Sequence, residues 1–307
     1  MSTAVSAPLA PPDPTRLRVV SALVAVQVAF GTLPVAGKLA MVHVGPFGLS
    51  LVRVSGAALF FGALFLAGNR VRIPLGDVLR IAGCGLLGMA ANQLLFLGGL
   101  ERSSATNATV LVTTIPVFTF VVALALRQER ATWRGALGLV LAFAGVLALV
   151  KVERFELASG TLVGDAMIVT NAFCYALYLV LVKPYLARYG TLPIVAIGFF
   201  ASMLAVLPFG LPQLGGVLDA DAETWGLLLY VVAVPTLLTY LLNAWALRYA
   251  SSSTVAIFIY LQPIVGLALA VAILHEQLGA RAALGTLAVF LGIALVTFRR
   301  AATAKAR

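Results

Sequence analysis

The sequence predicts an all-α, polytopic membrane protein in which ten transmembrane helices form two inverted five-helix repeats around a central cavity. Three observations lead to this fold class: an apolar composition, ten apolar segments of membrane-spanning length, and an internal repeat. Hydrophobic residues make up 62% of the 307 positions and charged residues only 10%, against about 25% charged residues in an average soluble domain. Because a water-soluble fold needs polar side chains over its surface, this composition predicts a surface that faces lipid.

Ten segments of the chain are long and apolar enough to be membrane spans, since a helix needs about 20 mostly apolar residues to cross the hydrocarbon core. Their connections are short and leave no room for a soluble domain. Residues 1–17, which are rich in proline, are predicted to form a disordered cytoplasmic tail, and residues 299–307 a basic cytoplasmic tail. The apolar run that follows residue 17 is too long for a cleavable signal. The ten predicted spans lie near 18–41, 46–68, 78–99, 104–126, 132–150, 161–182, 191–211, 224–247, 253–274 and 281–298.

Lysine and arginine are distributed unevenly between the two sides of the predicted membrane domain. With the N-terminus in the cytoplasm, about fifteen of them lie on the cytoplasmic side and four outside, as the positive-inside rule requires. We therefore expect a multi-pass protein of the bacterial inner membrane with both termini in the cytoplasm. The formal charge of +10 does not indicate nucleic-acid binding, because the charges stand in short clusters between apolar segments. Cys84 and Cys174 fall inside apolar segments, so we expect neither a disulfide framework nor a metal site.

The internal repeat appears when the chain is shifted by 147 residues, which places spans three to five on spans eight to ten without a gap. Twelve of the fifty positions that begin at Leu100 are then identical, and Glu129 meets Glu276. Each half contains five spans, an odd number, so the second half must enter the membrane from the opposite side. We expect the halves at 18–150 and 161–298. Inverted repeats are the architecture of alternating-access carriers, in which the substrate site lies near the midplane between the halves.

Several of these segments resemble the EamA branch of the drug/metabolite transporter superfamily. Residues 30–38 (FGTLPVAGK) resemble its aromatic-Gly-small…Lys signature, although Phe30 stands where the family usually has tryptophan. Arg53, early in the second span and followed by small residues, fits the same family. Two repeat-related segments resemble its Pro…Leu-x-x-Glu pattern: Pro116 with Leu126–Glu129, and Pro263 with Leu274–Glu276.

This resemblance extends from the first span to the tenth. It implies a ten-helix basket in which spans one, three, four, six, eight and nine surround a central cavity. It also implies export, or in some members uptake, of amino acids and related small metabolites.

Prolines inside four spans are candidate helix breaks or gating positions. Proline removes a backbone donor and frees a carbonyl one turn earlier, and in lipid such a group persists only where protein or a watery cavity satisfies it. The alternative is that the prolines only kink the helices for packing, and we favour a position beside the cavity for the repeat-related pair. The four are Pro34, Pro116, Pro235 and Pro263.

Polar side chains concentrate in the spans that are expected to line the cavity, and burying them in lipid is costly. Any one of them has an interhelical hydrogen bond as its simplest explanation, but as a set they predict a polar interior that binds substrate. The fifth and tenth spans carry small residues instead, which allow close helix approach and leave open a monomer or a homodimer through these two spans. The candidate substrate-binding residues are Asn92, Gln93, Asn107, Thr113, Asn171, Tyr175, Tyr178, Tyr240, Asn243, Trp245, Tyr260 and Gln262.

The charged residues within the spans separate the substrate classes. Lys38 and Arg53 are candidate substrate-binding cations, and neither of their spans contains a buried acid. A carboxylate-bearing substrate is therefore favoured over a multidrug or other cationic-compound efflux carrier, which needs a buried carboxylate. Lys38 has snorkelling to the interface as its alternative, and Arg53 has a structural clamp on carbonyls. The acids Asp165, Glu129 and Glu276 are candidates for proton coupling, or else form salt-bridged helix junctions.

The sequence lacks the motifs of other membrane functions. It has no Walker A loop to hold ATP phosphates, and no Ser-His-Asp or histidine-rich cluster at one depth, so we expect no catalytic residues, no metal and no cofactor. A membrane enzyme or scaffold is accordingly disfavoured. The sequence predicts a secondary carrier that exports amino acids or related small polar metabolites bearing a carboxylate, with the small-molecule substrate and the lipid bilayer as its partners.

Overall fold

The computed structural model describes residues 16–68, 71–103, 105–149, 161–265, 268 and 280–297. Within these ranges every regular element is a helix. The elements are α1 (Arg16–Ala67), α2 (Leu75–Gly85), η1 (Leu86–Ala91), α3 (Asn92–Arg102), α4 (Ala105–Val112), α5 (Ile115–Ala125), α6 (Trp133–Leu149), α7 (Leu162–Leu181), α8 (Lys183–Tyr189), α9 (Thr191–Gly210), η3 (Leu211–Gln213), α10 (Leu214–Leu218), α11 (Ala222–Val232), η4 (Ala233–Leu238), α12 (Thr239–Tyr249), α13 (Ser252–Ile257), η5 (Phe258–Leu261) and α15 (Ala280–Thr297).

These helices confirm the predicted all-α fold of ten apolar membrane helices. Six stretches are long and apolar enough to cross a membrane, and four shorter apolar helices complete the ten. The helix α1 already begins at Arg16, inside the predicted tail 1–17; the rest of that tail and the predicted tail 299–307 lie outside the described residues.

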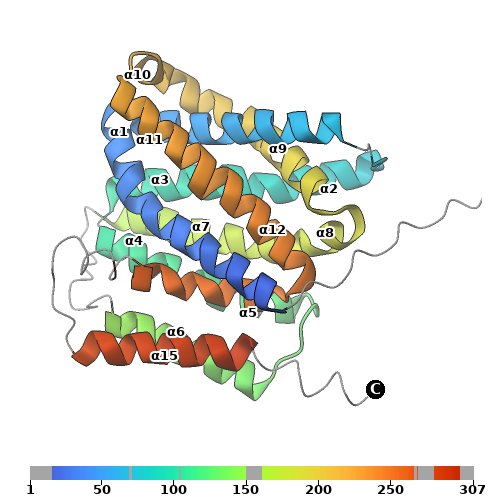
Figure 1. The fold of residues 1–307 in the computed structure, drawn as a ribbon, viewed down its shortest axis with the longest axis vertical. Helices are drawn as coiled ribbons and strands as arrows, with labels where there is room; N and C mark the ends of the chain where they lie inside the picture. Colours follow the sequence, from blue (N-terminus) through green and yellow to red (C-terminus); the bar gives the residue numbers. More distant parts are fainter. Residues whose placement is uncertain are drawn as a thin grey trace, which may run out of the picture.

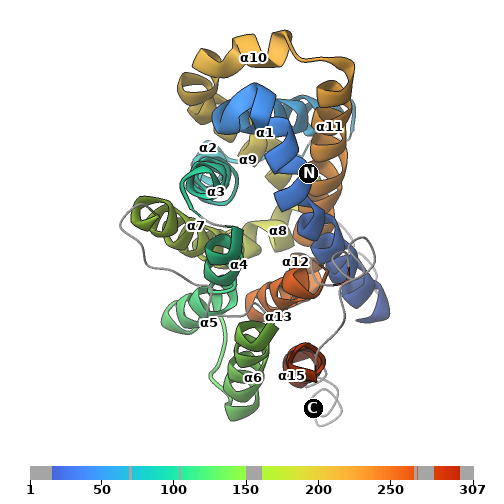
Figure 2. The same cartoon turned by 90° about the vertical axis from the view of Figure 1, so that its left-hand side faces the viewer.

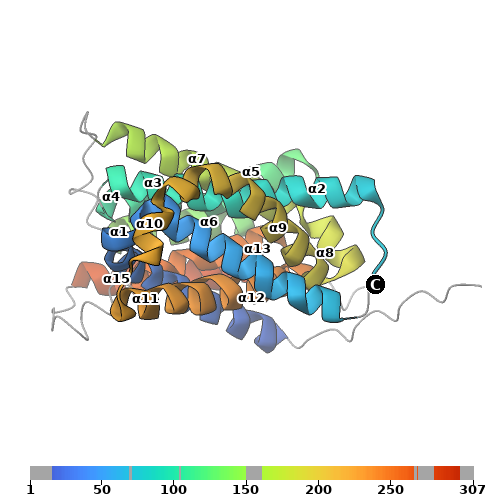
Figure 3. The ribbon, with the colours of Figure 1, turned by 90° about the horizontal axis from the view of Figure 1, so that it is seen from above.

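The bundle has two ends that carry different connections. Figure 3 shows α10 at one end and α8 at the other. Arg16 and Thr297, near the two limits of the described chain, line one cavity together with Lys183 at the start of α8. We call the end with these three residues the terminal end, and the other the opposite end.

Gly45 joins the first two predicted spans, which the helix α1 combines. Its φ of 69° and ψ of 167° lie in a region that favours glycine, and a Cβ there would stand 2.4 Å from Oε1 of Gln213. The same oxygen accepts hydrogen bonds from the N–H groups of Phe47 (2.9 Å) and Gly48 (2.8 Å). The first N–H groups of a helix have no intrahelical partner, so Gln213 satisfies two of them and fixes the reversal between the spans.

Two π-helical segments interrupt the third and eighth spans at equivalent positions of the repeat. The segment η1 joins α2 to α3, and η4 joins α11 to α12; an offset of 147 residues relates both their starts and their ends. In η4 Pro235 has no N–H to offer to the carbonyl of Val231, and Oγ1 of Thr236 donates to that carbonyl at 2.8 Å. Because π-bulges are frequent at functional sites, the two segments direct attention to the middle of each half.

The fourth and ninth spans are each divided, again at equivalent positions. A turn at Thr113 and Thr114 separates α4 from α5, and the 3₁₀ segment η5 follows α13. The offset of 147 places the turn on residues 260–261, which lie within η5. Pro116 and Pro263 follow these irregular stretches, and both are buried.

The fifth and tenth spans, α6 and α15, lie side by side at the edge of the molecule (Figures 1 and 2). A Cβ on Gly292 would stand 2.5 Å from the carbonyl oxygen of Gly138, and one on Gly145 would stand 2.7 Å from that of Gly285. The offset of 147 places Gly138 on Gly285 and Gly145 on Gly292, so the two contacts are equivalent, as a two-fold relation between the halves requires. The small-residue faces of these spans thus pack on each other within one chain, and a dimer through them would use their other faces.

Replacing Gly292 by alanine is expected to lower the thermal unfolding midpoint of the detergent-purified protein. The added Cβ would overlap the Gly138 backbone, and overpacking of this kind costs about 1–3 kcal/mol. The matched control is Gly83→Ala in α2, where a Cβ would have no atom within 4 Å. An equal midpoint for the two variants would contradict the close crossing of α6 and α15.

Candidate functional site

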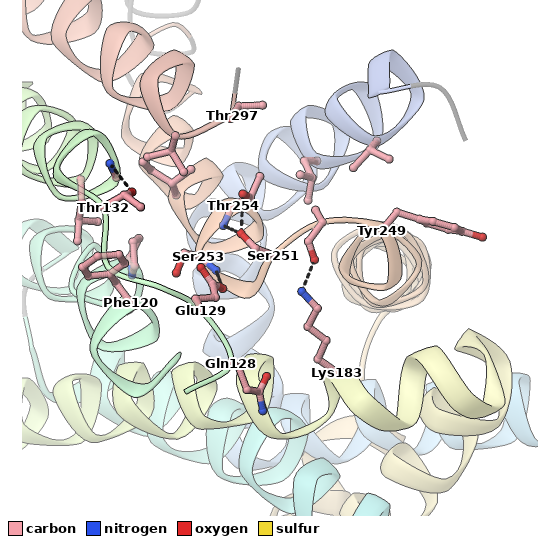
Figure 4. A pocket seen from close by; sticks show the side chains of 18 of the residues that line it. Phe120, Gln128, Glu129, Thr132, Lys183, Tyr249, Ser251, Ser253, Thr254 and Thr297 are labelled. Atoms are coloured by element: carbon pink, nitrogen blue, oxygen red, sulfur yellow. Dashed lines mark hydrogen bonds between the residues drawn. The ribbon is translucent and has the colours of Figure 1, made fainter. Parts of the chain in front are cut away.

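A cavity of about 770 Å³ opens at the terminal end between the two halves of the chain (Figure 4). The first half contributes the start of α1, the first part of α5, the connection 128–132 and the start of α6. The second half contributes Lys183, the corner 249–254 between α12 and α13, and the end of α15. A volume of this size is within the range of small-molecule sites, about 300–1,000 Å³.

The polar wall of the cavity is held by bonds that cross between elements. Oε1 of Glu129 accepts the N–H of Ser253 at 3.0 Å, and Nζ of Lys183 donates to the carbonyl of Ala250 at 2.7 Å. Ser251, at the N-cap of α13, accepts the N–H of Thr254 on its hydroxyl at 3.1 Å. Short polar side chains at a helix start are typical because they satisfy its free N–H groups. The corner between α12 and α13 is therefore fixed from both halves of the chain.

A buried polar network joins α3, α7 and α12. Nδ2 of Asn92 donates to Oδ1 of Asn171 at 2.7 Å, and the hydroxyl of Tyr240 lies 3.2 Å from Oδ1 of Asn92. Nδ2 of Asn243 donates to the hydroxyl oxygen of Tyr175 at 3.0 Å. The structure thus brings five of the predicted substrate-binding residues together, through the interhelical hydrogen bonds that were their simplest explanation.

The two π-segments each present one carbonyl to a side chain from the other half of the chain. The carbonyl of Gly88 in η1 accepts from Tyr240 at 3.1 Å, and that of Pro235 in η4 accepts from Nη2 of Arg53 at 3.2 Å. Nε of Arg53 also donates to Oγ1 of Thr236 at 2.9 Å, and Arg53 is only 2% exposed. Positions 88 and 235 are equivalent in the repeat. Arg53 therefore binds both the backbone and a side chain of η4, as a structural clamp would, and its role in substrate binding stays a prediction.

At the opposite end a buried carboxylate, that of Asp165, ties the start of α7 to the connection between α3 and α4. Ser103 donates to its Oδ1 at 2.5 Å, Asn107 donates to its Oδ2 at 3.0 Å, and Thr161 donates to Oδ2 at 3.2 Å. Asp165 is 4% exposed and Asn107 1%. Hydrogen bonds to the charged form of a carboxylate are among the stronger ones in proteins, so this junction holds the opposite end together.

Four further predicted residues lie buried outside the network. Gln93 in α3 and Tyr260 in η5 are at most 1% exposed, and the polar atoms of their side chains have no hydrogen-bond partner among the described residues. The ring of Tyr178 packs directly on Gly88, where a Cβ would lie 2.1 Å from Cγ of the tyrosine. The hydroxyl of Thr113 donates to the carbonyl of Val110 in its own turn, at 2.5 Å.

Two predicted residues have neighbours that the sequence did not reveal. Trp245 packs against Tyr249 with ring centroids 5.4 Å apart. Nε2 of Gln262 donates to Oε1 of Gln27 at 2.8 Å. Gln27 is 2% exposed and was missed as a candidate. A polar residue in the first apolar span was the available signal, because such residues are costly in lipid.

The remaining candidates are placed only in part. The backbone of α1 continues as helix through Pro34 and Lys38, but their side chains, and all of Glu276, lie outside the described residues. Of the predicted site residues, Pro116 and Glu129 line the described cavity, whereas the polar network does not. Among the described residues no group of histidine, cysteine and acidic side chains could hold a metal ion.

Comparison with known proteins agrees with this architecture. The EamA-like transporter family matches residues 17–151 and again residues 162–298. An uncharacterized transporter of Archaeoglobus fulgidus is 28% identical over 86% of this chain and 91% of its own length. A probable terminal-alkyne amino-acid exporter of Streptantibioticus cattleyicolor is 28% identical over 92% of this chain and 94% of its own. One crystal structure shares the fold with a TM-score of 0.72 and 18% identity, covering 93% of this chain and 100% of that one. The chain belongs to the EamA-like transporter family.

Proposed function

We propose that the protein is a secondary, alternating-access carrier that exports amino acids or related small metabolites bearing a carboxylate from the bacterial cytoplasm. The observation that carries this proposal is the cavity between the halves at the terminal end, combined with the Asp165 junction that holds the opposite end together. Among the described residues, a cavity at one end and a hydrogen-bonded junction at the other fit one of the two states of an alternating-access carrier.

The distribution of charge indicates which end of the protein faces the cytoplasm. The cavity is lined by Arg16, Arg130 and Lys183, with Glu129 as its acid. By the positive-inside rule the terminal end is cytoplasmic, so substrate enters the cavity from the cytoplasm. The excess of positive charge favours an anionic or carboxylate-bearing substrate over a lipophilic cation. The name of the relative from Streptantibioticus cattleyicolor, a probable amino-acid exporter, supports the same substrate class.

Proteoliposomes that contain the purified protein are expected to exchange a radiolabelled amino acid with an unlabelled internal pool faster than protein-free vesicles do. Exchange needs no external energy source, so it tests the carrier cycle separately from its coupling. Amino acids, a nucleoside and an organic anion are offered in parallel to define the class. If none of them moves faster than in protein-free vesicles, the proposed function is wrong.

A further inference from the structure

The cavity carries one acid and one lysine at the same polar corner, which residues 250–253 form between α12 and α13. Glu129 bonds to Ser253 and Lys183 bonds to Ala250, and Figure 4 shows the two charged side chains approaching the corner from different sides. They come from the loop after α5 and from the start of α8 respectively. Both charges are thus fixed relative to the same short stretch of backbone.

Glu129 presents its carboxylate together with a hydroxyl at this corner. Its Oε1 accepts the N–H of Ser253 at 3.0 Å, and the side chain is half-buried. Oγ of Ser253 is buried and has no hydrogen-bond partner among the described residues, and Ser253 belongs to the cavity lining. A carboxylate can accept several hydrogen bonds at once, so Glu129 can bind an ammonium group while it keeps its bond to Ser253.

Lys183 presents positive charge on the same wall. Its ammonium donates to the carbonyl of Ala250 at 2.7 Å, and the side chain is partly buried. A lysine ammonium carries three N–H donors, so it can serve a ligand carboxylate as well as this carbonyl. Arg16 and Arg130 also line the cavity, and they add to the positive potential that a carboxylate meets. A ligand with two ammonium groups is disfavoured for the same reason.

The lining also contains apolar side chains. Leu23 from α1, Phe120 from α5, Leu139 from α6 and Ile257 from α13 line the same space. Apolar walls with a few convergent polar groups are typical of small-molecule sites. The ligand that fits this distribution has its charges at one end and a hydrocarbon group at the other.

We propose that the 250–253 corner is an entry site for a zwitterionic amino acid with an apolar side chain. Glu129 and the Ser253 hydroxyl bind the α-ammonium group, Lys183 binds the α-carboxylate, and Leu23, Phe120, Leu139 and Ile257 contact the side chain. This inference rests on the proposed function and deepens it, because it names the charge pattern that the carrier selects and the residues that select it.

The test measures equilibrium binding of three radiolabelled ligands of nearly equal shape to the detergent-purified full chain. They are L-leucine, 4-methylpentanoate, which lacks the amine, and 3-methylbutylamine, which lacks the carboxylate. Leucine is expected to bind roughly 10- to 100-fold more tightly than either analogue, as the loss of a charged hydrogen bond implies. Glu129→Gln is expected to lower the affinity for leucine to that for 4-methylpentanoate, and to leave the affinity for 4-methylpentanoate unchanged. Lys183→Met is expected to lower the affinity for leucine to that for 3-methylbutylamine, and to leave the affinity for 3-methylbutylamine unchanged.

Controls separate recognition from stability. Glu101→Gln removes an exposed acid at the end of α3, and Arg134→Gln removes a cation of α6 that is not part of the lining; both are expected to keep the wild-type order of ligands. If Glu129→Gln or Lys183→Met lowered the affinity for all three ligands equally, the inference would be overturned. An equal loss is what a folding defect produces, because such a defect does not distinguish an amine from a carboxylate. A wild type that does not prefer leucine, including one that binds none of the three, also overturns it.

The binding test and the exchange test can contradict the site and the carrier separately. Leucine binding that depends on Glu129 and Lys183, without exchange in proteoliposomes, would contradict the carrier and leave the site standing. Exchange of an amino acid without this ligand order would contradict the site and leave the carrier standing.

Discussion

Arg53→Met is expected to reduce amino-acid exchange at least about 10-fold, since one buried hydrogen bond to a charged group contributes about 1.5–3 kcal/mol. Arg53 donates from α1 to the Pro235 carbonyl and to Thr236 in η4, and methionine keeps only the apolar stem. The Pro235 carbonyl then loses the donor that the other half of the chain supplies. We expect η4 to change its winding, and with it the position of α12 beside the cavity. Exchange in proteoliposomes measures the effect.

The variant Arg53→Lys tests whether Arg53 acts by binding two acceptors at once or only by its positive charge. A guanidinium reaches two acceptors in a fixed fork, whereas a lysine ammonium is a compact point charge. If the fork matters, the lysine variant exchanges as slowly as Arg53→Met. Wild-type exchange by Arg53→Lys would show instead that charge alone suffices, as it would for a residue that attracts a substrate carboxylate. Arg80→Met is the control, because the Arg80 side chain is 71% exposed.

Asp165→Ala is expected to open the opposite end of the pathway. The carboxylate accepts from Ser103 and Asn107, so its removal releases the connection between α3 and α4 from α7. The measurement is labelling of Ala108→Cys by a membrane-impermeant maleimide, added outside in a background with Cys84 and Cys174 replaced by alanine. Ala108 is 4% exposed. Because hydrogen bonds to a charged group are lost, we expect Ala108→Cys to be labelled roughly 10- to 100-fold faster in the Asp165→Ala variant than in the protein with Asp165.

Glu101→Ala is the matched control for this experiment. Glu101 is an acid of the same end, but its side chain is 47% exposed and pairs only with Arg102 among the described residues. It should label at the wild-type rate. Labelling of the Asp165 variant at that same rate would contradict a role of the junction in closing the opposite end.

The spans could be predicted because length and hydropathy decide which segments lie in lipid. The break between the first two spans was expected between residues 41 and 46, and the turn is found at Gly45, inside that gap. The winding of η1 and η4 could not be predicted. Their sequences, LLGMAA and AVPTLL, share no residue at equivalent positions. Only the alignment of Gly88 with Pro235 hinted that both spans are weakened there, because either residue disfavours a regular helix.

The candidate site could be predicted as a set of polar residues but not as contacts. Asn92 and Asn171 are 79 residues apart, and Arg53 and Thr236 are 183 apart. Such pairs depend on how distant helices pack, which the pattern within one span does not contain. Ser253, at the start of the ninth span, gave no signal, since polar residues are expected at a helix start in any case.

The crossing of α6 with α15 has a consequence for biosynthesis. The glycines of α6 pack on a helix that is translated about 150 residues later, which at 5–20 residues per second is roughly 8–30 s. During that interval the face with Gly138 and Gly145 has entered the membrane without its final neighbour. A nascent chain therefore exposes this face to lipid, or to chaperones of membrane insertion, until its last helix arrives. Truncation before residue 280 would leave this face without its partner helix permanently.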